Sequence, residues 1–292
     1  MKHLVLILLL NLLSTSAYAL GQQGHKMVCE LAFKQLSSLQ QQTLIEFTEF
    51  LTTTDKKQIN QRLRRTSDHP VSFADSCIWP DLIKSKPQYV PFKSWHFINV
   101  PRNSIKVDTK DCQQNCILHA FDFHHRQLKQ ALALNLAHEA GEAIRFISHW
   151  FGDLHQPMHV SFKSDLGGNR LPVKIENNTL KCHNMHALWD HCLTSFNRRQ
   201  FEQQVLTYFN QYALQPSDQY NQANLFAWAN DTLAITRDSK TQYCVLSPRG
   251  YCRKVETPIL ISPTYIKHNR KILAQQVALA AKRLHSYLKE NL

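Results

Sequence analysis

The apolar residues of this chain recur with the period of an amphipathic helix. In the C-terminal segment they stand three or four positions apart, on one helix face that packs on a core; they are Leu273, Val277, Ala280, Leu284 and Leu288. Similar patterns occur near residues 25–36, 117–134, 136–152, 184–197 and 222–237. The pattern therefore predicts a fold dominated by helices.

Two short stretches and the turns between elements complete this prediction. Trp95–Val100 and Leu171–Glu176 look strand-like, and turns such as Gly167-Gly168-Asn169 bound the elements. The sequence has no internal repeat and no low-complexity linker at which to divide it. We therefore predict an all-α fold, a single compact helical domain over residues 20–292 with at most a small β-element.

Residues 1–19 have the pattern of a secretory signal peptide. A short basic start precedes an apolar stretch from Leu4 to Leu13, and Ala17-Tyr18-Ala19 forms a small-x-small cleavage site. We predict cleavage after Ala19, which makes Leu20 the first residue of a secreted or periplasmic protein. The apolar stretch is shorter than the roughly 18 residues that a membrane span needs, and no other stretch predicts a stable membrane anchor.

An even number of cysteines in an exported chain favours disulfides over thiolate metal ligands. The eight are Cys29, Cys77, Cys112, Cys116, Cys182, Cys192, Cys244 and Cys252. Proximity favours the pairs Cys112–Cys116 and Cys244–Cys252, but these spacings leave the connectivity open.

The net charge of the chain is +12, and it falls by one when Lys2 leaves with the signal peptide. A strongly basic surface attracts polyanions, which include nucleic acids and anionic membranes. A basic surface that is only solvated is the alternative. Charge therefore indicates a class of partner without choosing between its members.

Candidate chemistry lies in His and Asp residues four positions apart. His149 and Asp153 share one face of a predicted helix, and His186 and Asp190 repeat the spacing. A single pair of this kind is more often a surface ion pair. Both pairs, however, have Trp or Phe neighbours that place them inside the domain, where an unpaired charge is costly and a metal ion removes the cost.

A proline turn extends this candidate metal site. Pro157 is predicted to end the helix that carries Asp153, so that His159 can return beside the first pair. Oxygen and nitrogen ligands without thiolates suit zinc, and several carboxylates permit more than one ion. Two zinc ions roughly 3.5–4 Å apart, bridged by a carboxylate, form a known arrangement for hydrolysing phosphate esters. Asp153 is the candidate bridge.

Six segments in a shared order carry a resemblance to a known family. They are Gly21–His25, Trp79–Asp81, Trp95–Asn99, His149–His159, Gly167–Asn169 and Asn184–Asp190. Together they resemble the zinc-dependent S1/P1 nuclease family over essentially the whole mature sequence. The resemblance implies three zinc ions, held by Asp81, His96, His149 and Asp153, by the free amine and carbonyl of Leu20 with His25 and Asp153, and by His159, His186 and Asp190.

The resemblance also implies a phosphate contact and a disulfide. Lys84 matches a basic position near the phosphate, where it can neutralise charge in the transition state, although a solvated surface lysine is the alternative. Cys29 and Cys77 match a pair that links the N-terminal helix to the Asp81 segment.

A base-binding slot follows from the residues beside the predicted ligands. A base stacked on Phe97 contributes about 1–3 kcal/mol and must be unpaired to enter, which favours single strands. Leu166 is the predicted opposite wall, and Asn99 and Asn169 are predicted to hydrogen-bond the base or sugar. Two residues depart from the family. Leu20 stands where many members have Trp, and Asn99 stands where some fungal members have Asp.

Other histidines match no ligand position, and we expect them on the surface or behind the ligands; they are His124, His125, His155, His183 and His191. The predicted function is zinc-dependent hydrolysis of single-stranded DNA and RNA to 5′-phosphorylated products, with 3′-nucleotidase activity, by a monomer. The alternatives are a zinc-dependent phospholipase C and a non-catalytic zinc or nucleic-acid binding protein.

Overall fold

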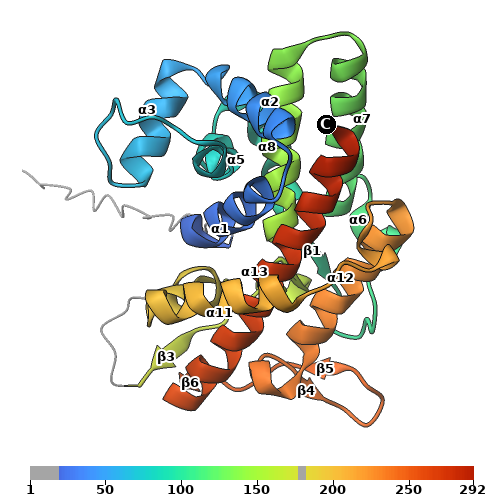
Figure 1. Ribbon diagram of the computed structural model, residues 1–292. Helices are drawn as coiled ribbons and strands as arrows, with labels where there is room; N and C mark the ends of the chain where they lie inside the picture. The colour runs from blue at the N-terminus through green and yellow to red at the C-terminus, as the bar shows by residue number, and fades with distance from the viewer. Residues whose placement is uncertain (1–19, 177–181) are drawn as a thin grey trace, which may run out of the picture.

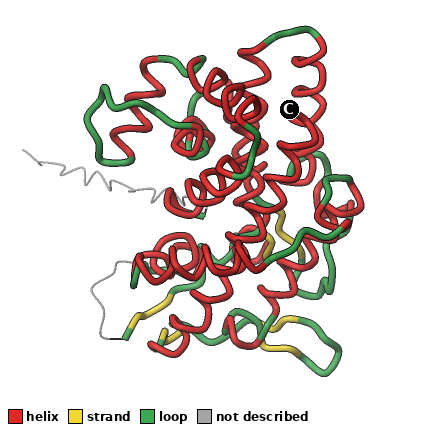
Figure 2. Tube along the Cα trace, viewed as in Figure 1, coloured by secondary structure: helices red, strands yellow, loops and turns green. Residues whose placement is uncertain are grey.

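The computed structural model describes residues 20–176 and 182–292, so the predicted signal peptide lies outside the described residues. Helices dominate the described chain, and the strands between them are short (Figures 1 and 2). The α-helices are α1 (Gly21–Lys34), α2 (Ser38–Glu49), α3 (Thr53–Arg62), α4 (Phe73–Ser76), α5 (Trp79–Ile83), α6 (Thr109–Cys112), α7 (Ile117–Ala133), α8 (Ala137–Leu154), α9 (Met185–Ala187), α10 (Leu193–Ser195), α11 (Arg198–Gln211), α12 (Gln222–Arg237) and α13 (Pro263–Asn291). The predicted all-α class is confirmed.

Short helices and strands connect these elements. The 3-10 helices are η1 (Pro87–His96), η2 (Pro157–His159), η3 (Lys163–Asp165), η5 (Pro216–Asp218) and η6 (Ser239–Thr241), and η4 (Leu188–Cys192) is a π-helix. The strands are β1 (Ile98–Val100), β2 (Val160–Phe162), β3 (Val173–Ile175), β4 (Val245–Leu246), β5 (Cys252–Arg253) and β6 (Ile259–Ile261). They pair as β1 with β2 and β3 with β6, both parallel, and β4 with β5, antiparallel.

Helix α8 lies at the centre of the molecule. Almost every residue from Ala140 to Leu154 is buried, as expected of a helix that is covered on all sides. It packs against α7, α13, α1 and α2, and Figure 1 shows α13 crossing in front of it. His149 and Asp153 are therefore held on a helix whose second half is entirely enclosed.

Several helix starts are encoded by side chains that satisfy free backbone amides. Ser37 and Gln40 form a capping box at α2, and the hydroxyl of Ser262 accepts the amide hydrogen of Tyr265 at the start of α13. Pro263 takes the first position of α13, where the missing N–H costs no hydrogen bond.

The structure differs from the predicted elements in several places, and it contains two helices, α2 and α3, where the sequence patterns predicted none. Trp95 and His96 end the 3-10 helix η1, so the strand predicted over Trp95–Val100 begins only at Ile98. Helix α11 was missed because its buried stripe is narrow, formed by Phe201, Val205 and Phe209. The helix predicted near 184–197 is interrupted by the π-helix η4, whose wider turn a period of 3.6 does not reveal.

All eight cysteines form disulfides. The pairs are Cys29–Cys77, Cys112–Cys116, Cys182–Cys192 and Cys244–Cys252. Three of these pairs agree with the sequence-based expectations, and four disulfides are typical of exported proteins. Among the described residues, none of the helices combines the length and apolar character that crossing a membrane requires.

Candidate metal centre

Helix α8 presents His149 and Asp153 one turn apart, and both side chains are fully buried. Their contact joins His149 Nε2 and Asp153 Oδ2 at 3.2 Å. The Nδ1–H of His149 donates to the carbonyl of Cys77 at 2.7 Å, which turns Nε2 toward the carboxylate. Spacing on the helix and one backbone acceptor therefore orient this pair.

Asp153 is the point at which four histidines meet. His25 Nε2 lies 3.2 Å from its Oδ1, and His96 Nδ1 lies 2.9 Å from its Oδ2. His159 Nδ1 lies 3.4 Å from Oδ1, so imidazoles from α1, η1, α8 and η2 all reach this carboxylate. Such a position suits a carboxylate that is shared between two metal ions.

A second carboxylate, Asp190, gathers the rest of the cluster. His186 Nε2 lies 3.2 Å from its Oδ2, and His159 Nε2 lies 3.6 Å from its Oδ1. The amide of Gln156 donates to Oδ1 at 2.5 Å. Sequence reasoning missed Gln156, although it stands between Asp153 and Pro157 in the motif and is completely buried.

Asp81 and Lys84 close the cluster on the α5 side. Asp81 Oδ1 lies 3.8 Å from His96 Nδ1 and 4.0 Å from His149 Nε2. Lys84 Nζ donates to Asp81 Oδ1 at 2.9 Å. Burial lowers the pKa of Lys84, but Asp81 outweighs it and raises the pKa above its usual value. The lysine therefore stays charged beside the candidate ligands.

Three groups of these side chains could each hold a metal ion, because their ligand atoms lie within 4.8 Å of one another. They are His25, Asp81 and His149; His96, His149 and Asp153; and His159, His186 and Asp190. The third group has the same members as the third predicted ligand set. The first two groups contain the remaining predicted side-chain ligands in a different arrangement. His25 is grouped with Asp81 and His149, although it also lies near Asp153.

The histidines of the third group are oriented by backbone carbonyls. The Nδ1–H of His159 donates to the carbonyl of His96 at 2.7 Å, and that of His186 donates to Gly167 at 2.8 Å. In each ring Nδ1 is thereby engaged, and Nε2 faces Asp190. Hydrogen bonds of this kind fix the tautomer of metal-binding histidines.

Buried polar atoms at the centre lack hydrogen-bond partners, and this is the test of whether the residues fit metal ions. Both ring nitrogens of His25, Nε2 of His96 and His159, Oδ1 of Asp153 and Oδ2 of Asp190 are buried without one. Leaving such atoms unsatisfied is costly in a folded protein. Nitrogen and oxygen atoms gathered this closely are the ligands that zinc binds.

The charges at the centre are strongly coupled. Burial raises the pKa of Asp153, but His149 and His159 outweigh it and hold the pKa well below its usual range. Burial lowers the pKa of His159, but Asp153 and Asp190 raise it to about 9. Burial lowers the pKa of His96 to about 4, so this imidazole is held in the neutral form that a metal requires.

Leu20, the predicted first residue of the mature protein, is packed into the same region. Its side chain is 1% exposed. A Cβ on Gly24 would lie 2.5 Å from Leu20 Cγ, and a Cβ on Gly21 would lie 2.4 Å from the carbonyl oxygen of Asp190. Both glycines therefore allow the start of α1 to approach the cluster closely.

The predicted base-slot residues lie between η1 and β1, on β1 itself, and on the turn after η3. Phe97 and Asn99 are partly buried, and Asn99 pairs with Ser161 of β2. Asn99 Oδ1 is buried without a hydrogen-bond partner. Leu166 is 48% exposed, and the amide of Asn169 donates to the carbonyl of Leu166 at 2.8 Å.

A cleft of about 1050 Å³ borders the cluster at Asp190. Its walls come from α1, from the end of α3 and from the segment 190–202. Its cationic side chains are those of Lys26, Arg62, Arg64, Arg65 and Arg198. The sequence showed a basic chain, and the structure places part of that charge beside the cluster.

Two histidines expected on the surface or behind the ligands are completely buried, so a surface position is wrong for both. His124 lies in an aromatic cluster with Phe92, Trp95 and Trp150. Nε2 of His155 lies 2.8 Å from Nη1 of Arg283.

The fold and the site define a class: a disulfide-linked helical protein with a buried His and Asp centre that fits several metal ions. The particular family follows from comparison with known proteins. This chain belongs to the S1/P1 nuclease family, whose model matches residues 20–292.

Curated relatives carry related names. The chain is 30% identical to Endonuclease 5 of Arabidopsis thaliana over 239 residues, which is 78% of this chain and 72% of the relative. Endonuclease 3 of the same plant is 28% identical over 233 residues, 78% of this chain and 70% of the relative. Nuclease S1 of Aspergillus oryzae is 30% identical over 122 residues, 40% of each chain. Family membership supports hydrolysis of phosphodiester bonds in nucleic acid.

Proposed function

We propose that the mature chain, residues 20–292, is a zinc-dependent nuclease that cleaves single-stranded DNA and RNA to 5′-phosphorylated products and removes phosphate from 3′-nucleotides. The observation that carries the proposal is the meeting of four imidazoles at Asp153, with a second cluster at Asp190. We propose that it acts as a secreted or periplasmic monomer without a membrane anchor.

The proposed ligand sets use the side chains of the centre. Asp81, His96, His149 and Asp153 hold one zinc ion, the amine and carbonyl of Leu20 with His25 and Asp153 hold a second, and His159, His186 and Asp190 hold a third. Zinc would supply a nucleophile at neutral pH, because coordination strongly lowers the pKa of bound water, to about 7. The chain contributes the spacing, because Asp153 reaches His25 with Oδ1 and His96 with Oδ2.

Lys84 is proposed to neutralise charge on the phosphate in the transition state. Its ammonium is held by Asp81, within the cluster, and 16% of its side chain is exposed. We predict that Lys84→Gln lowers kcat about 10²–10³-fold with little change in KM, as expected when one transition-state donor is lost.

Steady-state kinetics on a single-stranded oligonucleotide measures this effect. Lys86→Gln is the matched control, because Lys86 lies two positions away and pairs with Asp55 instead, at 2.7 Å. Equal kcat values for the wild type and Lys84→Gln would refute the role.

The preference for single strands is proposed to arise in the slot between Phe97 and Leu166. A base can stack on Phe97 only after it leaves its partner strand. The buried, unpartnered oxygen of Asn99 is available to accept a hydrogen bond from the base or sugar, as is proposed for Asn169. The amide of Asn99 can also donate, which a carboxylate at this position cannot.

One substrate panel separates the proposal from the phospholipase alternative. The purified mature protein is assayed on single-stranded DNA, double-stranded DNA, RNA, 3′-AMP and phosphatidylcholine, and its zinc content is measured. We expect about three zinc ions per chain and release of 5′-phosphorylated products. Lipid turnover without nucleotide release would overturn the proposal, as would a protein that binds no zinc.

Asp153→Asn separates the proposal from a non-catalytic binder. Loss of the shared carboxylate charge is expected to abolish hydrolysis, whereas a protein that only binds polyanions would keep its affinity and show no reaction before or after the change. Undiminished hydrolysis by Asp153→Asn would contradict the bridging assignment.

A further inference from the structure

The turn Leu166–Asn169 has a backbone conformation that needs an anchor. Leu166, Gly167 and Gly168 have consecutive positive φ angles of 55°, 64° and 81°. This region is unfavourable for leucine and tolerated by glycine. The turn is tied at Asp165, whose Oδ1 accepts the amide hydrogen of Gly168 at 2.9 Å. Asp165 is 4% exposed.

Two side-chain donors also hold the carboxylate of Asp165, and one of them, Tyr243, is buried. Nη2 of Arg102 donates to Oδ2 at 2.5 Å, and the hydroxyl of Tyr243 donates to Oδ1. That hydroxyl in turn accepts a hydrogen bond from Ser161 Oγ at 3.0 Å. Each oxygen of the carboxylate is thus occupied, and no contact with water is needed to satisfy it.

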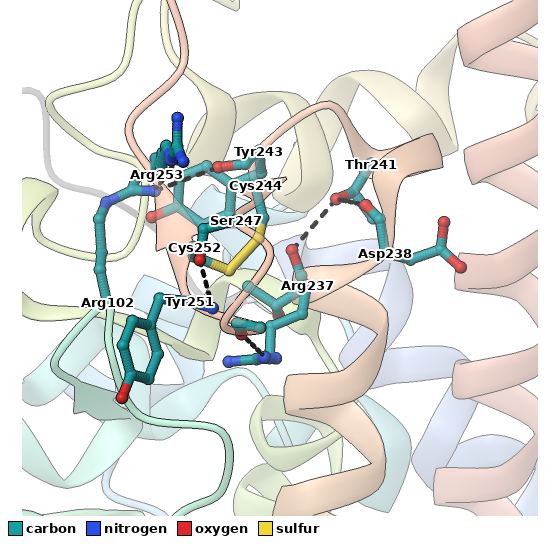
Figure 3. Close-up of a disulfide and its surroundings, with 12 residues drawn as sticks. Arg102, Arg237, Asp238, Thr241, Tyr243, Cys244, Ser247, Tyr251, Cys252 and Arg253 are labelled. Atoms are coloured by element: carbon teal, nitrogen blue, oxygen red, sulfur yellow. Dashed lines mark hydrogen bonds between the residues drawn. A yellow bond between two sulfur atoms is a disulfide. The ribbon is translucent and has the colours of Figure 1, made fainter.

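The hairpin closed by the Cys244–Cys252 disulfide supports these donors (Figure 3). Nη1 of Arg102 donates to the carbonyl of Arg253 at 3.1 Å, and the carbonyl of Arg102 accepts the amide hydrogen of Cys252 at 3.0 Å. The guanidinium also lies over the ring of Phe162, 4.5 Å from its centroid. Arg102 is therefore fixed before it reaches Asp165.

The turn held by Asp165 faces both halves of the proposed site. The carbonyl of Gly167 accepts the Nδ1–H of His186 at 2.8 Å, and the carbonyl of Gly168 accepts the amide hydrogen of His186 at 3.4 Å. Leu166, at the start of the turn, is the proposed wall of the base slot. A Cβ on Gly167 would lie 3.5 Å from Asn99 Oδ1, so the turn also borders β1.

We propose that Asp165 is a positioning residue for the nuclease reaction. Its carboxylate fixes the turn so that Leu166 forms the slot wall and His186 presents Nε2 to the third metal group. This inference rests on the proposed function, because the slot and the third ligand set belong to it. Asp165 acts through the turn and touches neither substrate nor metal.

The experiment compares Asp165→Asn with Asp218→Asn, a closely matched control. Asp218 is 1% exposed, and it accepts hydrogen bonds from Arg283 at 2.9 Å, from the hydroxyl of Tyr212 at 2.8 Å and from the amide of Gln215 at 2.9 Å. Both aspartates thus bind an arginine, a tyrosine and a backbone amide. Only Asp165 holds the turn.

Four properties are measured on the mature protein: the Tm, the zinc content, kinetics on 3′-AMP, and amide hydrogen exchange of the peptide that contains residues 166–169 in the zinc-free protein. Asp165→Asn is expected to speed this exchange, to lose about one zinc ion, and to lower kcat/KM about 10–100-fold with a raised KM. Asp218→Asn is expected to lower the Tm without these three changes.

The outcome is decided even if Asp165→Asn folds poorly. Tyr243→Phe keeps the ring and removes one donor to Asp165, and we expect smaller changes in the same direction. Unchanged exchange, zinc content and KM in Asp165→Asn, or in Tyr243→Phe if only that variant folds, would overturn the inference. An inactive wild type would instead refute the proposed function, while the exchange data would still decide whether Asp165 anchors the turn.

Discussion

At the residue scale, Gly152 creates the space in which the N-terminal segment meets α8. An ideal Cβ on Gly152 would lie 2.6 Å from Nδ1 of His25 and 3.2 Å from Cδ2 of Leu20. Only a glycine fits at position 152, because the imidazole of His25 occupies the space that a larger side chain would fill. The sequence shows this glycine only as a poor helix former before Asp153.

Gly152→Ala is predicted to displace His25 and to lower the zinc content and the activity. In an open helix position the same change stabilises by about 1 kcal/mol, so a lower Tm or no gain would itself indicate the clash. Metal analysis and thermal unfolding measure both effects. Gly141→Ala is the control on the same helix, because its Cβ would meet Phe47 at 3.0 Å, away from the ligands. A raised Tm with unchanged zinc content in Gly152→Ala would contradict this prediction.

His124 shows the cost of burying a titratable ring. Burial among aromatic side chains lowers the pKa of His124 to about 3. The ring packs against Trp95 and Trp150, which are the sequence neighbours of His96 and His149. His124 therefore supports the candidate ligands as an uncharged packing group.

The buried His124 predicts a loss of stability in acid. Its pKa is lower in the folded protein than in the unfolded chain, where it is about 6.5. As the pH falls from about 6.5 toward 3 the unfolded chain gains a proton that the folded protein does not, so this group lowers the free energy of unfolding by about 1.4 kcal/mol per pH unit. Urea unfolding at several pH values measures the free energy of unfolding as a function of pH. Between about pH 6.5 and 3 the slope of this plot should be smaller by this amount in His124→Phe than in the wild type. Parallel pH profiles for the two proteins would count against it.

At the scale of elements, the cluster is assembled from helices that a disulfide joins. Cys29 in α1 is bonded to Cys77, which follows α4 and precedes the α5 segment that carries Asp81. The carbonyl of Cys77 also accepts the Nδ1–H of His149. One covalent link therefore fixes three of the segments that supply candidate ligands.

Replacing Cys29 and Cys77 with serine is predicted to lower both stability and zinc affinity. The cysteines are 48 positions apart, and closing a loop of that length contributes about 4 kcal/mol in the chain-entropy model. Chelator competition and unfolding curves measure the two losses. The Cys112–Cys116 pair spans four positions, so its removal is expected to cost about 2 kcal/mol and to leave zinc affinity unchanged. Equal zinc affinity in both double variants would oppose the prediction.

At the scale of the whole molecule, Leu20, the predicted first residue of the mature protein, lies in the interior instead of on the surface. Leu20 is buried, and α1 begins beside Asp190 and the large cleft. Figure 1 shows α1 at the centre of the molecule, between the helices α3 and α5 and the crossing helix α11. The predicted cleavage after Ala19 would therefore create the new N-terminal amine at the proposed site.

A protein that retains Ala19 is predicted to lose most of its activity and about one zinc ion. The free amine of Leu20 exists only after cleavage, because in the precursor the same nitrogen is an amide that cannot serve as a ligand. Metal analysis and hydrolysis of 3′-AMP compare the extended protein with one that begins at Leu20. A tag after Leu292 is the control for added residues. Full activity of the extended protein would contradict the coordination by Leu20.

Short-range patterns in the sequence predicted the helical class, most of the long helices and both His-Asp pairs. These features depend on residues three or four positions apart, whose relation is set by the geometry of one helix. The family resemblance likewise depends on short motifs and their order. The narrow apolar stripe of α11 and the π-helix after Ala187 were missed, because neither follows a broad pattern with a period of 3.6.

By itself, the sequence determined the class of fold, the cysteine set and the types of side chain available for metal binding. Only the tertiary structure decided that Gln156 donates to Asp190 and that Asp165 holds the turn beside His186. It also gave the distances at which His25 and His96 lie from Asp153, a meeting that the family resemblance had only implied. These contacts join residues that are distant along the chain or that share no helix face. Their geometry depends on how the helices pack, and no local periodicity encodes that packing.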